Sequence, residues 1–421
     1  MPAVLVLLAA LAARHRLRSE PERESTVLLF SLLWACATPP EPQLECEVLS
    51  GPPSDDPADW QVDTAQSWVP VVSEPTFIIP GEGLPVTPQA ANNNVALAMA
   101  GGRLFVAWRT APNHFASEQT ELHVISSATG GPPWTEEATF ALGTDVREPA
   151  FLLTDGALSL SFFEAGSNPG AFEPHAIWHA TRCNAGDWTA EPISDGEKVA
   201  WDIKTRDGIA LRTSYSGDHY GAGLLDLHFE RSDDGGATWA PFGADPVSVG
   251  GDSEAAFEIG SDGTLLAVTR NEDGDATGAG TKVCSAPAED WSDWTCSDPS
   301  DPERYDSPEL VRHGDDLYLL ARRDVGGPFG PEGDLLSYSL RPKRSALYRL
   351  DQAARKVEWI QDIPGVGDTA FVSAWRTEAD QFVFANYTSP LDTPDLTWLE
   401  GQTNPLGTQI YLATLDFVSA L

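Results

Sequence analysis

The chain has 421 residues, 42% of them hydrophobic, with 36 glycines, 33 prolines and 14 tryptophans. This composition is typical of a globular protein with many turns and short strands, and it disfavours long helices. The 63 acidic and 26 basic side chains give a formal net charge of -37, which repels phosphate backbones and anionic head groups at long range. We therefore expect an all-β protein with a solubilising acidic surface that does not bind nucleic acid.

The first 36 residues contain two short apolar runs, separated by the basic run 14–18. The second run ends in Leu33-Trp34-Ala35-Cys36, which resembles a bacterial lipoprotein signal, in which the cysteine receives the lipid. Neither run reaches the roughly 18 to 20 apolar residues of a spanning helix. The resemblance implies an extracytoplasmic protein of the cell envelope, lipid-anchored on Cys36 or secreted. Either the true start of translation lies between the two runs, or one two-part signal covers both.

The mature chain is expected to begin with an extended linker. Residues 37–60 include Pro39, Pro40 and Pro42, which favour an extended tether between the anchor and the folded domain. Residues 61–421 are then predicted to form a single repeat-built domain.

A tryptophan-marked unit recurs along the chain. Four segments carry Ser, Thr or Cys seven positions before a Trp, and they cover residues 127–134, 181–188, 232–239 and 284–291. They follow one another at intervals of about 51 to 54 residues. This spacing is typical of one four-stranded propeller blade per repeat.

The segment 232–239 reads Ser-Asp-Asp-Gly-Gly-Ala-Thr-Trp. It resembles the Asp-box, or BNR repeat, of sialidases and related propellers, Ser-x-Asp-x-Gly-x-Thr-Trp, at all five defining positions. In such a turn Asp234 would cap backbone N–H groups, Gly236 would take a positive φ, and Trp239 would pack between blades. The resemblance implies a structural motif on the face away from the substrate.

A second unit consists of an apolar strand, a turn and another apolar strand. It occurs six times, at residues 95–109, 148–164, 201–215, 254–270, 308–322 and 371–387. These units predict a six-bladed β-propeller. The last blade lacks one strand, which residues 67–72 can supply, so we expect the ring to be closed by an N-terminal strand added to the last blade.

Aligning the blades places side chains of one kind at the mouth of the central channel. Five blades have a carboxylate at or just before the first strand, namely Glu148, Asp202, Glu254, Asp306 and Asp368. These residues either face the channel or cap turns. At the end of the second strand, the matching residues include Arg109, Tyr215, Arg270, Arg322 and Tyr387. The arginines either pair with neighbouring acids or converge as a clamp for a carboxylate.

The resemblance to sialidases covers residues 95–417 as a fold. The segment 254–270 is similar to the family's fourth blade, which implies that Glu254 assists the nucleophile and Arg270 binds the substrate carboxylate. Other family positions differ: residues 92–94 are three asparagines where the first arginine belongs, and His114 and Glu118 stand near the position of the acid. The nucleophilic tyrosine has no direct counterpart, since Tyr387 lies at the far end of the second strand.

Segments around Asp306 and Asp368 are similar to those of other sugar-cleaving propellers, in which carboxylates replace the tyrosine. Two carboxyl groups across a channel can share the acid and base roles if their environments differ. The catalytic candidates are Glu254, Asp306, Glu309, Asp368 and Tyr387. The substrate-binding candidates are Arg109, Arg270, Arg322, Glu148, Asp202 and Tyr215.

Four cysteines remain after Cys36, an even number that suits two disulfides in an exported chain. Cys284 and Cys296 are close enough in sequence to form a hairpin pair, and Cys46 with Cys183 follows by elimination. The sequence holds no phosphate loop, no dinucleotide-binding glycine pattern and no His-Glu-x-x-His pair, so no cofactor and no metal site is predicted.

The resemblance to sialidases implies an exo-acting glycoside hydrolase that cleaves a terminal acidic or neutral sugar with carboxylates at the channel mouth and an arginine clamp. The alternative is a non-catalytic propeller of the cell envelope that binds glycan or protein. In either case we expect a monomer whose partner is a glycan or glycoconjugate and whose contact with the membrane is the lipid anchor alone.

Overall fold

The computed structural model describes Leu49 and residues 54–183, 186–193, 197–221, 223–297, 305–327 and 335–420. Residues Cys46–Leu421 form one compact unit. The predicted signal segment with Cys36, and also Cys46, lie outside the described residues. None of the described helices is both long and apolar enough to cross a membrane.

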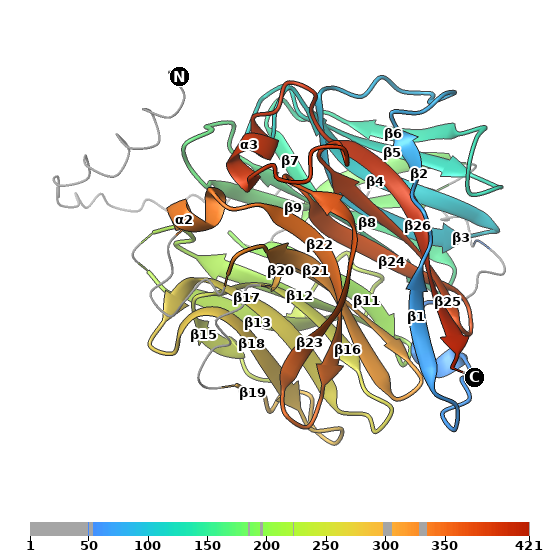
Figure 1. The fold of residues 1–421 in the computed structure, drawn as a ribbon, viewed down its shortest axis with the longest axis vertical. Helices are drawn as coiled ribbons and strands as arrows, with labels where there is room; N and C mark the ends of the chain where they lie inside the picture. Colours follow the sequence, from blue (N-terminus) through green and yellow to red (C-terminus); the bar gives the residue numbers. More distant parts are fainter. Residues whose placement is uncertain are drawn as a thin grey trace, which may run out of the picture. The chain divides into compact units, whose positions relative to one another are not determined.

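Six small antiparallel sheets make up the compact unit, and each sheet is one blade (Figure 1). Blade 1 contains β3 (Ala91–Ala100), β4 (Arg103–Ala111), β5 (Glu121–Ser127) and β6 (Thr135–Phe140). Blade 2 contains β7 (Asp145–Thr154), β8 (Ala157–Ala165), β9 (Pro174–Cys183) and β10 (Asp187–Ile193). Blade 3 contains β11 (Val199–Arg206), β12 (Ile209–Gly217), β13 (Leu225–Ser232), β14 (Ala240–Pro241) and β15 (Ser248–Gly250).

The remaining blades follow the same plan. Blade 4 contains β16 (Asp252–Ile259), β17 (Leu265–Asp275), β18 (Gly278–Ala286) and β19 (Thr295–Cys296). Blade 5 contains β20 (Tyr305–His313), β21 (Asp316–Asp324), β22 (Lys343–Asp351) and β23 (Lys356–Val366). Blade 6 contains β24 (Ala370–Glu378), β25 (Gln381–Thr388), β26 (Gln409–Ser419), β1 (Trp68–Val72) and β2 (Thr76–Ile79). The short helices are η2 (Pro57–Asp59), α2 (Leu335–Ser339) and α3 (Trp398–Gln402).

The six blades form a ring. Their first strands contact one another in the order β3, β7, β11, β16, β20 and β24, and β24 in turn contacts β3. This cyclic order confirms the predicted six-bladed propeller. The N-terminal strand β1 pairs antiparallel with the C-terminal strand β26, from Trp68 opposite Ser419 to Val72 opposite Leu415.

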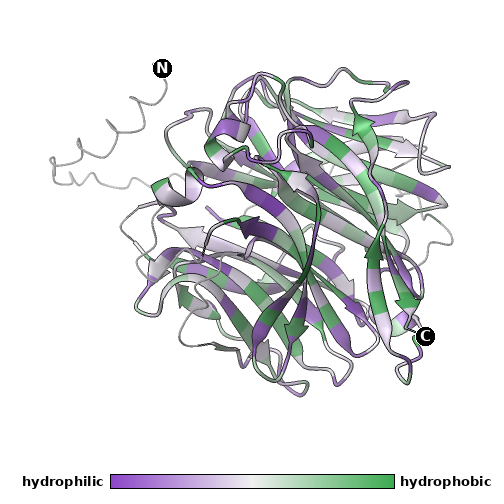
Figure 2. Cartoon of the chain, viewed as in Figure 1, coloured by the Kyte–Doolittle hydropathy of each residue, from purple (hydrophilic) through white to green (hydrophobic). Residues whose placement is uncertain are grey.

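Two-residue turns join the first and second strands of the early blades. The turn residues are Gly101 with Gly102, Asp155 with Gly156, and Asp207 with Gly208, and all six have positive φ. This is the type I′ geometry whose twist matches a tight hairpin, which explains the recurring Gly/Asp signal between apolar strands. Burial alternates along the outer strand β10, whereas the inner strand β3 is buried along nearly its whole length. Hydrophobic and hydrophilic residues are interspersed along the strands of the sheets (Figure 2).

The turn at residues 232–239 is held by its own side chains. Asp234 accepts hydrogen bonds from the Thr238 backbone N–H (2.8 Å) and hydroxyl (2.6 Å), and the Gly236 N–H donates to the Ser232 hydroxyl (2.8 Å). The Trp239 indole donates to the Gly236 carbonyl (2.9 Å), and the Arg212 guanidinium lies 4.5 Å above its ring. These contacts make the turn a structural clip of blade 3.

A disulfide joins Cys284 in β18 to Cys296 in β19, as predicted. Because β19 is only two residues long, this covalent link fixes the short outer strand of blade 4 to its neighbour. Cys183 is also disulfide-bonded, but its predicted partner, Cys46, lies outside the described residues.

Replacing Asp234 with Ala should lower the free energy of unfolding by about 1 kcal/mol, because the turn loses its capping acceptor. Urea denaturation of the two proteins would measure this difference. Asp233→Ala is the matched control, since the Asp233 side chain is 79% exposed and pairs loosely with Arg231 at 3.5 Å. Equal stability of the two variants would contradict a structural role for Asp234.

Candidate functional site

The first strands of all six blades are irregular at the same level. The pairing of each first strand with its second strand shifts register near its start, after Asn93, Arg147, Ala200, Asp252, Asp306 and Ala370. Asn94, Glu148, Ser307 and Phe371, which lie in these irregularities, have positive φ. Such bulges re-aim side chains, and strain of this kind clusters at functional sites. We call this region, residues 92–94, 145–148, 199–202, 252–254, 305–308 and 368–371, the channel mouth.

Side chains of different blades meet at the channel mouth. Trp201 of blade 3 donates its indole N–H to the carbonyl of Pro308 in blade 5 (3.1 Å), and its ring lies 4.5 Å from that of Phe371 in blade 6. The backbone N–H of Ser307 donates to Oε2 of Glu254 in blade 4 (2.7 Å). Matching positions in the blades therefore converge.

Arg270 is surrounded by carboxylates. Its guanidinium lies 2.6 Å from Glu254 Oε1 and 3.0 Å from Asp306 Oδ1, and it also pairs with Glu272. Burial alone would lower the pKa of Arg270, but the three carboxylates raise it well above the usual value. Arg270 is therefore a fixed cation that joins blades 4 and 5.

Arg322 borders the same carboxylate from the other side. Its Nη1 lies 3.6 Å from Asp306 Oδ2, and its Nε donates to the carbonyl of Thr369 (2.8 Å). Tyr338 of α2 donates its hydroxyl to Asp306, and the Trp398 ring lies 5.0 Å from the Arg322 guanidinium. Of the predicted residues, the structure thus brings Glu254, Asp306, Arg270 and Arg322 together.

Arg109, the third predicted arginine, belongs to a different group. It donates to Asp145 from Nε (3.0 Å) and Nη2 (2.7 Å), and to the side-chain carbonyl of Asn93 (3.2 Å). Arg147 also pairs with Asp145. Burial acts to raise the pKa of Asp145, but the two arginines lower it below its usual value. Arg109 therefore does not share a carboxylate with Arg270 or Arg322.

Asp368 of blade 6 is held between two side chains. His114 Nδ1 lies 2.7 Å from Asp368 Oδ2, and the Tyr387 hydroxyl donates to Oδ1 (3.2 Å). Burial lowers the pKa of His114, although Asp368 opposes the shift. Burial and the nearby Asp368 raise the pKa of Tyr387 well above its usual value. The Asp368 carboxyl group is therefore oriented by a phenol that stays neutral at neutral pH and by an imidazole whose charged form is disfavoured.

Glu148 differs from the other carboxyl groups of the channel mouth. Burial, and then the negative charge of Glu254, raise its pKa to about 8, while Arg147 and Arg270 act in the opposite direction. Its Oε2 is buried and has no hydrogen-bond partner among the described residues. Glu148 is therefore a protonated carboxylic acid at neutral pH, placed near a carboxylate.

Asp202 and Glu309 meet at a lysine. The Lys204 ammonium lies 2.9 Å from Asp202 Oδ2 and 3.8 Å from Glu309 Oε1, and it also donates to the carbonyls of Phe257 and Leu310. Burial raises the pKa of Glu309 to about 8, while Lys204 lowers it. The structure thus places these two predicted residues in a separate group.

Aromatic side chains surround Tyr215. Its ring lies 6.5 Å from that of Phe172 and 5.6 Å from that of His219, and Tyr220 stacks on His219 at 3.8 Å. Burial raises the pKa of Tyr215 well above its usual value, and the negative charges of Glu148 and Glu254 add to the shift. Tyr220 is half exposed, so this cluster offers an aromatic face of the kind on which sugar rings stack.

Sequence reasoning missed several members of the site. Glu272 lies two residues beyond Arg270 on β17, so strand alternation could have placed it on the same face. Tyr338 lies on α2, between β21 and β22, where no repeat predicts its position. Asn93 was noted only as a departure from an arginine. Asp145 precedes the predicted start of its blade and carried no signal.

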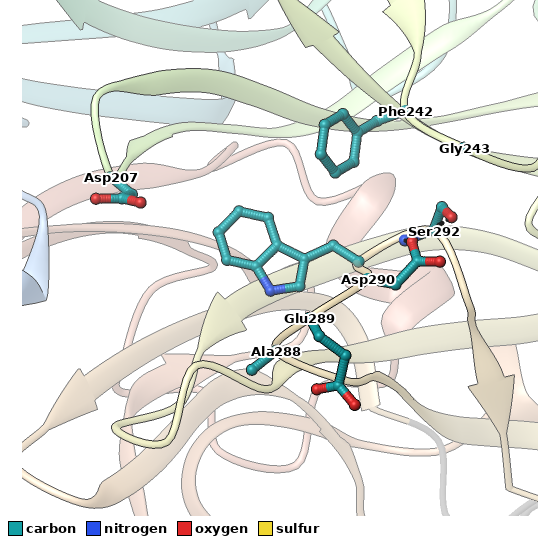
Figure 3. A pocket seen from close by; sticks show the side chains of 8 residues that line it. Asp207, Phe242, Gly243, Ala288, Glu289, Asp290 and Ser292 are labelled. Carbon is teal, nitrogen blue, oxygen red and sulfur yellow. Dashed lines mark hydrogen bonds between the residues drawn. The ribbon is translucent and has the colours of Figure 1, made fainter.

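A separate hollow of about 430 Å³ lies between blades 3 and 4 (Figure 3). It is lined by the β11–β12 turn residue Asp207, by Phe242 and Gly243, and by residues 288–292. Because Asp207 follows the end of β11, this hollow lies at the opposite end of the blades from the channel mouth. It contains none of the predicted site residues, and we do not assign the chemistry to it. Among the described ranges, no three His, Cys, Asp or Glu side chains are grouped to hold a metal ion.

Fold and site together define a six-bladed propeller with a charged channel mouth. Comparison with solved structures finds the same fold in a protein of unknown function from Dyadobacter fermentans, with a TM-score of 0.59 and 14% identity over 83% of this chain and 99% of that one. The phage phi92 endosialidase is similar with a TM-score of 0.54 and 10% identity, over 80% of this chain and 69% of that one. The Trypanosoma rangeli sialidase in complex with the inhibitor DANA gives 0.53 and 11%, over 77% and 55%.

At these identities the likeness shows a sialidase-like propeller fold and nothing finer. This chain spans only about half of the length of the Trypanosoma rangeli sialidase. No family model and no curated protein matches the sequence.

Glu148 predicts a specific pH dependence of stability. The carboxyl binds its proton more tightly in the folded than in the unfolded chain, so its contribution to stability is complete at low pH and is lost as pH rises from about 4.5 towards about 8. Replacement by Gln removes this loss. As pH rises through this window, the free energy of unfolding of the wild type should therefore fall relative to that of Glu148→Gln. The difference should change by at most about 1.4 kcal/mol per pH unit.

Urea denaturation of both proteins between pH 5 and pH 9 would measure the difference. Glu191→Gln, an exposed position on β10, is the matched control and should follow the wild type. Parallel curves for Glu148→Gln and the wild type would rule out a raised pKa at Glu148.

Proposed function

We propose that the channel mouth is the active site of an extracytoplasmic, exo-acting glycoside hydrolase. The observation that supports this most directly is the pair Glu148 and Glu254. Glu148 keeps its proton at neutral pH, whereas Glu254 is paired with the Arg270 guanidinium and the Ser307 N–H. Two carboxyl groups in contrasting environments, one protonated and one ionised, can act as the general acid and the base or nucleophile that cleave a glycosidic bond.

In the proposed reaction, Glu148 donates its proton to the leaving oxygen as the bond between that oxygen and the anomeric carbon breaks. Glu254 acts on the same carbon, either directly or through a water molecule, and water finally supplies the hydroxyl of the released sugar. The Asp368 carboxylate, with His114 and Tyr387, borders the site from blade 6. A carboxylate at this place would stabilise positive charge that develops on the sugar ring.

The exo mode follows from what lies at the axis. Trp201 reaches from blade 3 to Pro308 of blade 5 and Phe371 of blade 6, so an indole crosses the channel at the level of the bulges. A glycan entering the mouth would meet this indole, and only the end of a chain would fit above it. Tyr220 and Phe172 would stack on the terminal ring.

We further propose that residues 1–36 are the signal segment, that 37–60 link the anchor to the ring, and that 61–421 form the propeller domain. The N–H of Leu49 donates to the carbonyl of Gly156, and Asp55 pairs with Arg206, both at the ends of first strands. These contacts are at the opposite end of the blades from the mouth.

The alternative is a non-catalytic propeller that binds glycan or protein. It is favoured by the arginines, because Arg109, Arg270 and Arg322 are all paired with carboxylates of the chain itself. This alternative predicts binding of a glycan or a protein without turnover.

The hydrolase predicts loss of turnover when either carboxyl group of the pair is removed. Glu148→Gln and Glu254→Gln should each lower kcat by about 10²- to 10⁴-fold on the glycoside that the wild type cleaves. The assay is a panel of chromogenic glycosides with protein lacking residues 1–36, and Glu191→Gln serves as control. If the wild type binds a glycan but cleaves none of the panel, the binding module is the correct reading.

The lipid anchor predicts a change of cell fraction. Expressed from its natural start in a bacterial host, the wild type should be recovered with the membranes, and Cys36→Ser should be recovered in the soluble fraction. Mass spectrometry of the mature N-terminus would identify the acylated cysteine. Membrane recovery of both proteins would exclude Cys36 as the anchor.

A further inference from the structure

The two arginines at the border of blades 4 and 5 already hold a carboxylate, that of Asp306. Arg270 Nε lies 3.0 Å from one oxygen of Asp306, and Arg322 Nη1 lies 3.6 Å from the other. Tyr338 donates its hydroxyl to the same side chain. The Asp306 side chain is 0% exposed, so it is an integral part of this arrangement.

The charges of this group leave no attraction for a further anion. Arg270 and Arg322 supply two positive charges, and Glu254, Glu272 and Asp306 supply three negative charges in direct contact with them. The sum is -1. A carboxylate on a ligand would have to displace a buried ion pair and would then face two carboxylates, which is costly at short range.

The other arginines of the mouth are paired as well. Arg109 and Arg147 share the carboxylate of Asp145, so that separate group keeps one net positive charge. The net charge of -37 adds a long-range repulsion against anionic ligands. At the Arg270–Arg322 pair, local pairing and overall charge therefore act against the same class of ligand, anions.

We propose that Asp306 is a built-in occupant of the arginine pair and that the site selects terminal sugars that carry no carboxylate. The inference rests on the proposed glycosidase or glycan-binding role of the mouth for its substrate class. The occupancy of the arginine pair by Asp306 can be tested without any sugar.

The first experiment compares sugars that differ only at C6. Wild-type protein lacking residues 1–36 is assayed for binding and turnover with p-nitrophenyl glucoside against glucuronide, and galactoside against galacturonide, in both anomeric forms. We expect the neutral member of a pair to be preferred by about tenfold or more, because the acidic member brings a carboxylate to a site of net negative charge. Equal or better recognition of the acidic member would overturn the inference.

The second experiment uses a vacated arginine pair. Asp306→Ala removes the carboxylate and leaves space for a small anion between Arg270 and Arg322. We expect this variant to melt below the wild type and sodium formate to raise its melting temperature towards the wild-type value, beyond the effect of equal sodium chloride. Asp306→Asn is the control, since its amide fills the space and formate should have no specific effect.

The two experiments separate the possible failures. If none of the sugars is bound, the proposed function fails, and formate rescue of Asp306→Ala still decides whether Asp306 occupies the arginine pair. If formate does not distinguish Asp306→Ala from Asp306→Asn, the occupancy is wrong. If Asp306→Ala does not fold, the sugar pairs measured on the wild type alone decide the inference.

Discussion

The packing of six first strands around one axis is the constraint on which this structure depends. It brings charged side chains from all blades into a buried space, where an unpaired charge is costly. Nearly every charge there is consequently matched, as in Arg109 with Asp145, Arg206 with Glu258 and Arg270 with Glu254 and Asp306. These ion pairs often join different blades, so they set the register of the ring as well as its electrostatics.

Against this background, the carboxyl group that is not paired carries functional meaning. Glu148 has a buried oxygen without a partner among the described residues and a raised pKa, and its backbone has a positive φ. A desolvated acid on a strained backbone lowers the stability of the fold, and such groups cluster at functional sites. The same reasoning explains why the arginines are weaker evidence for ligand binding, since each has a structural reason to be present.

The sequence allowed the architecture to be predicted because the signals for it are local. The turns at Asp155–Gly156 and Asp207–Gly208 each indicate one hairpin, and the number of such strand–turn–strand units predicts the number of blades. Glu254 and Arg270 could be brought together because they lie on adjacent strands of one blade. The contact of Arg270 with Asp306 could not be predicted, since it joins one blade to the next and strand pairing within a blade says nothing about it. Tyr338 enters from a connection without a repeat, and Asp202 and Glu309 are drawn together by Lys204, a residue whose position on β11 carried no signal of its own.

At the opposite end of the ring, buried charges are also paired, and the segment before β1 takes part in the pairing. Asp55, from the segment before β1, lies 3.2 Å from Arg206 and accepts a hydrogen bond from the backbone N–H of Arg376. Arg206 in turn donates two hydrogen bonds of 2.7 Å to Glu258. The ring of Trp60 lies 5.9 Å from the Arg376 guanidinium. Here the N-terminal segment adds the Asp55 carboxylate to the Arg206–Glu258 pair and places the Trp60 ring beside Arg376. At the channel mouth, Asn94 Oδ1, Ser307 Oγ and Glu148 Oε2 are buried and have no hydrogen-bond partner among the described residues, so hydrogen-bonding capacity is left unused at that end of the ring.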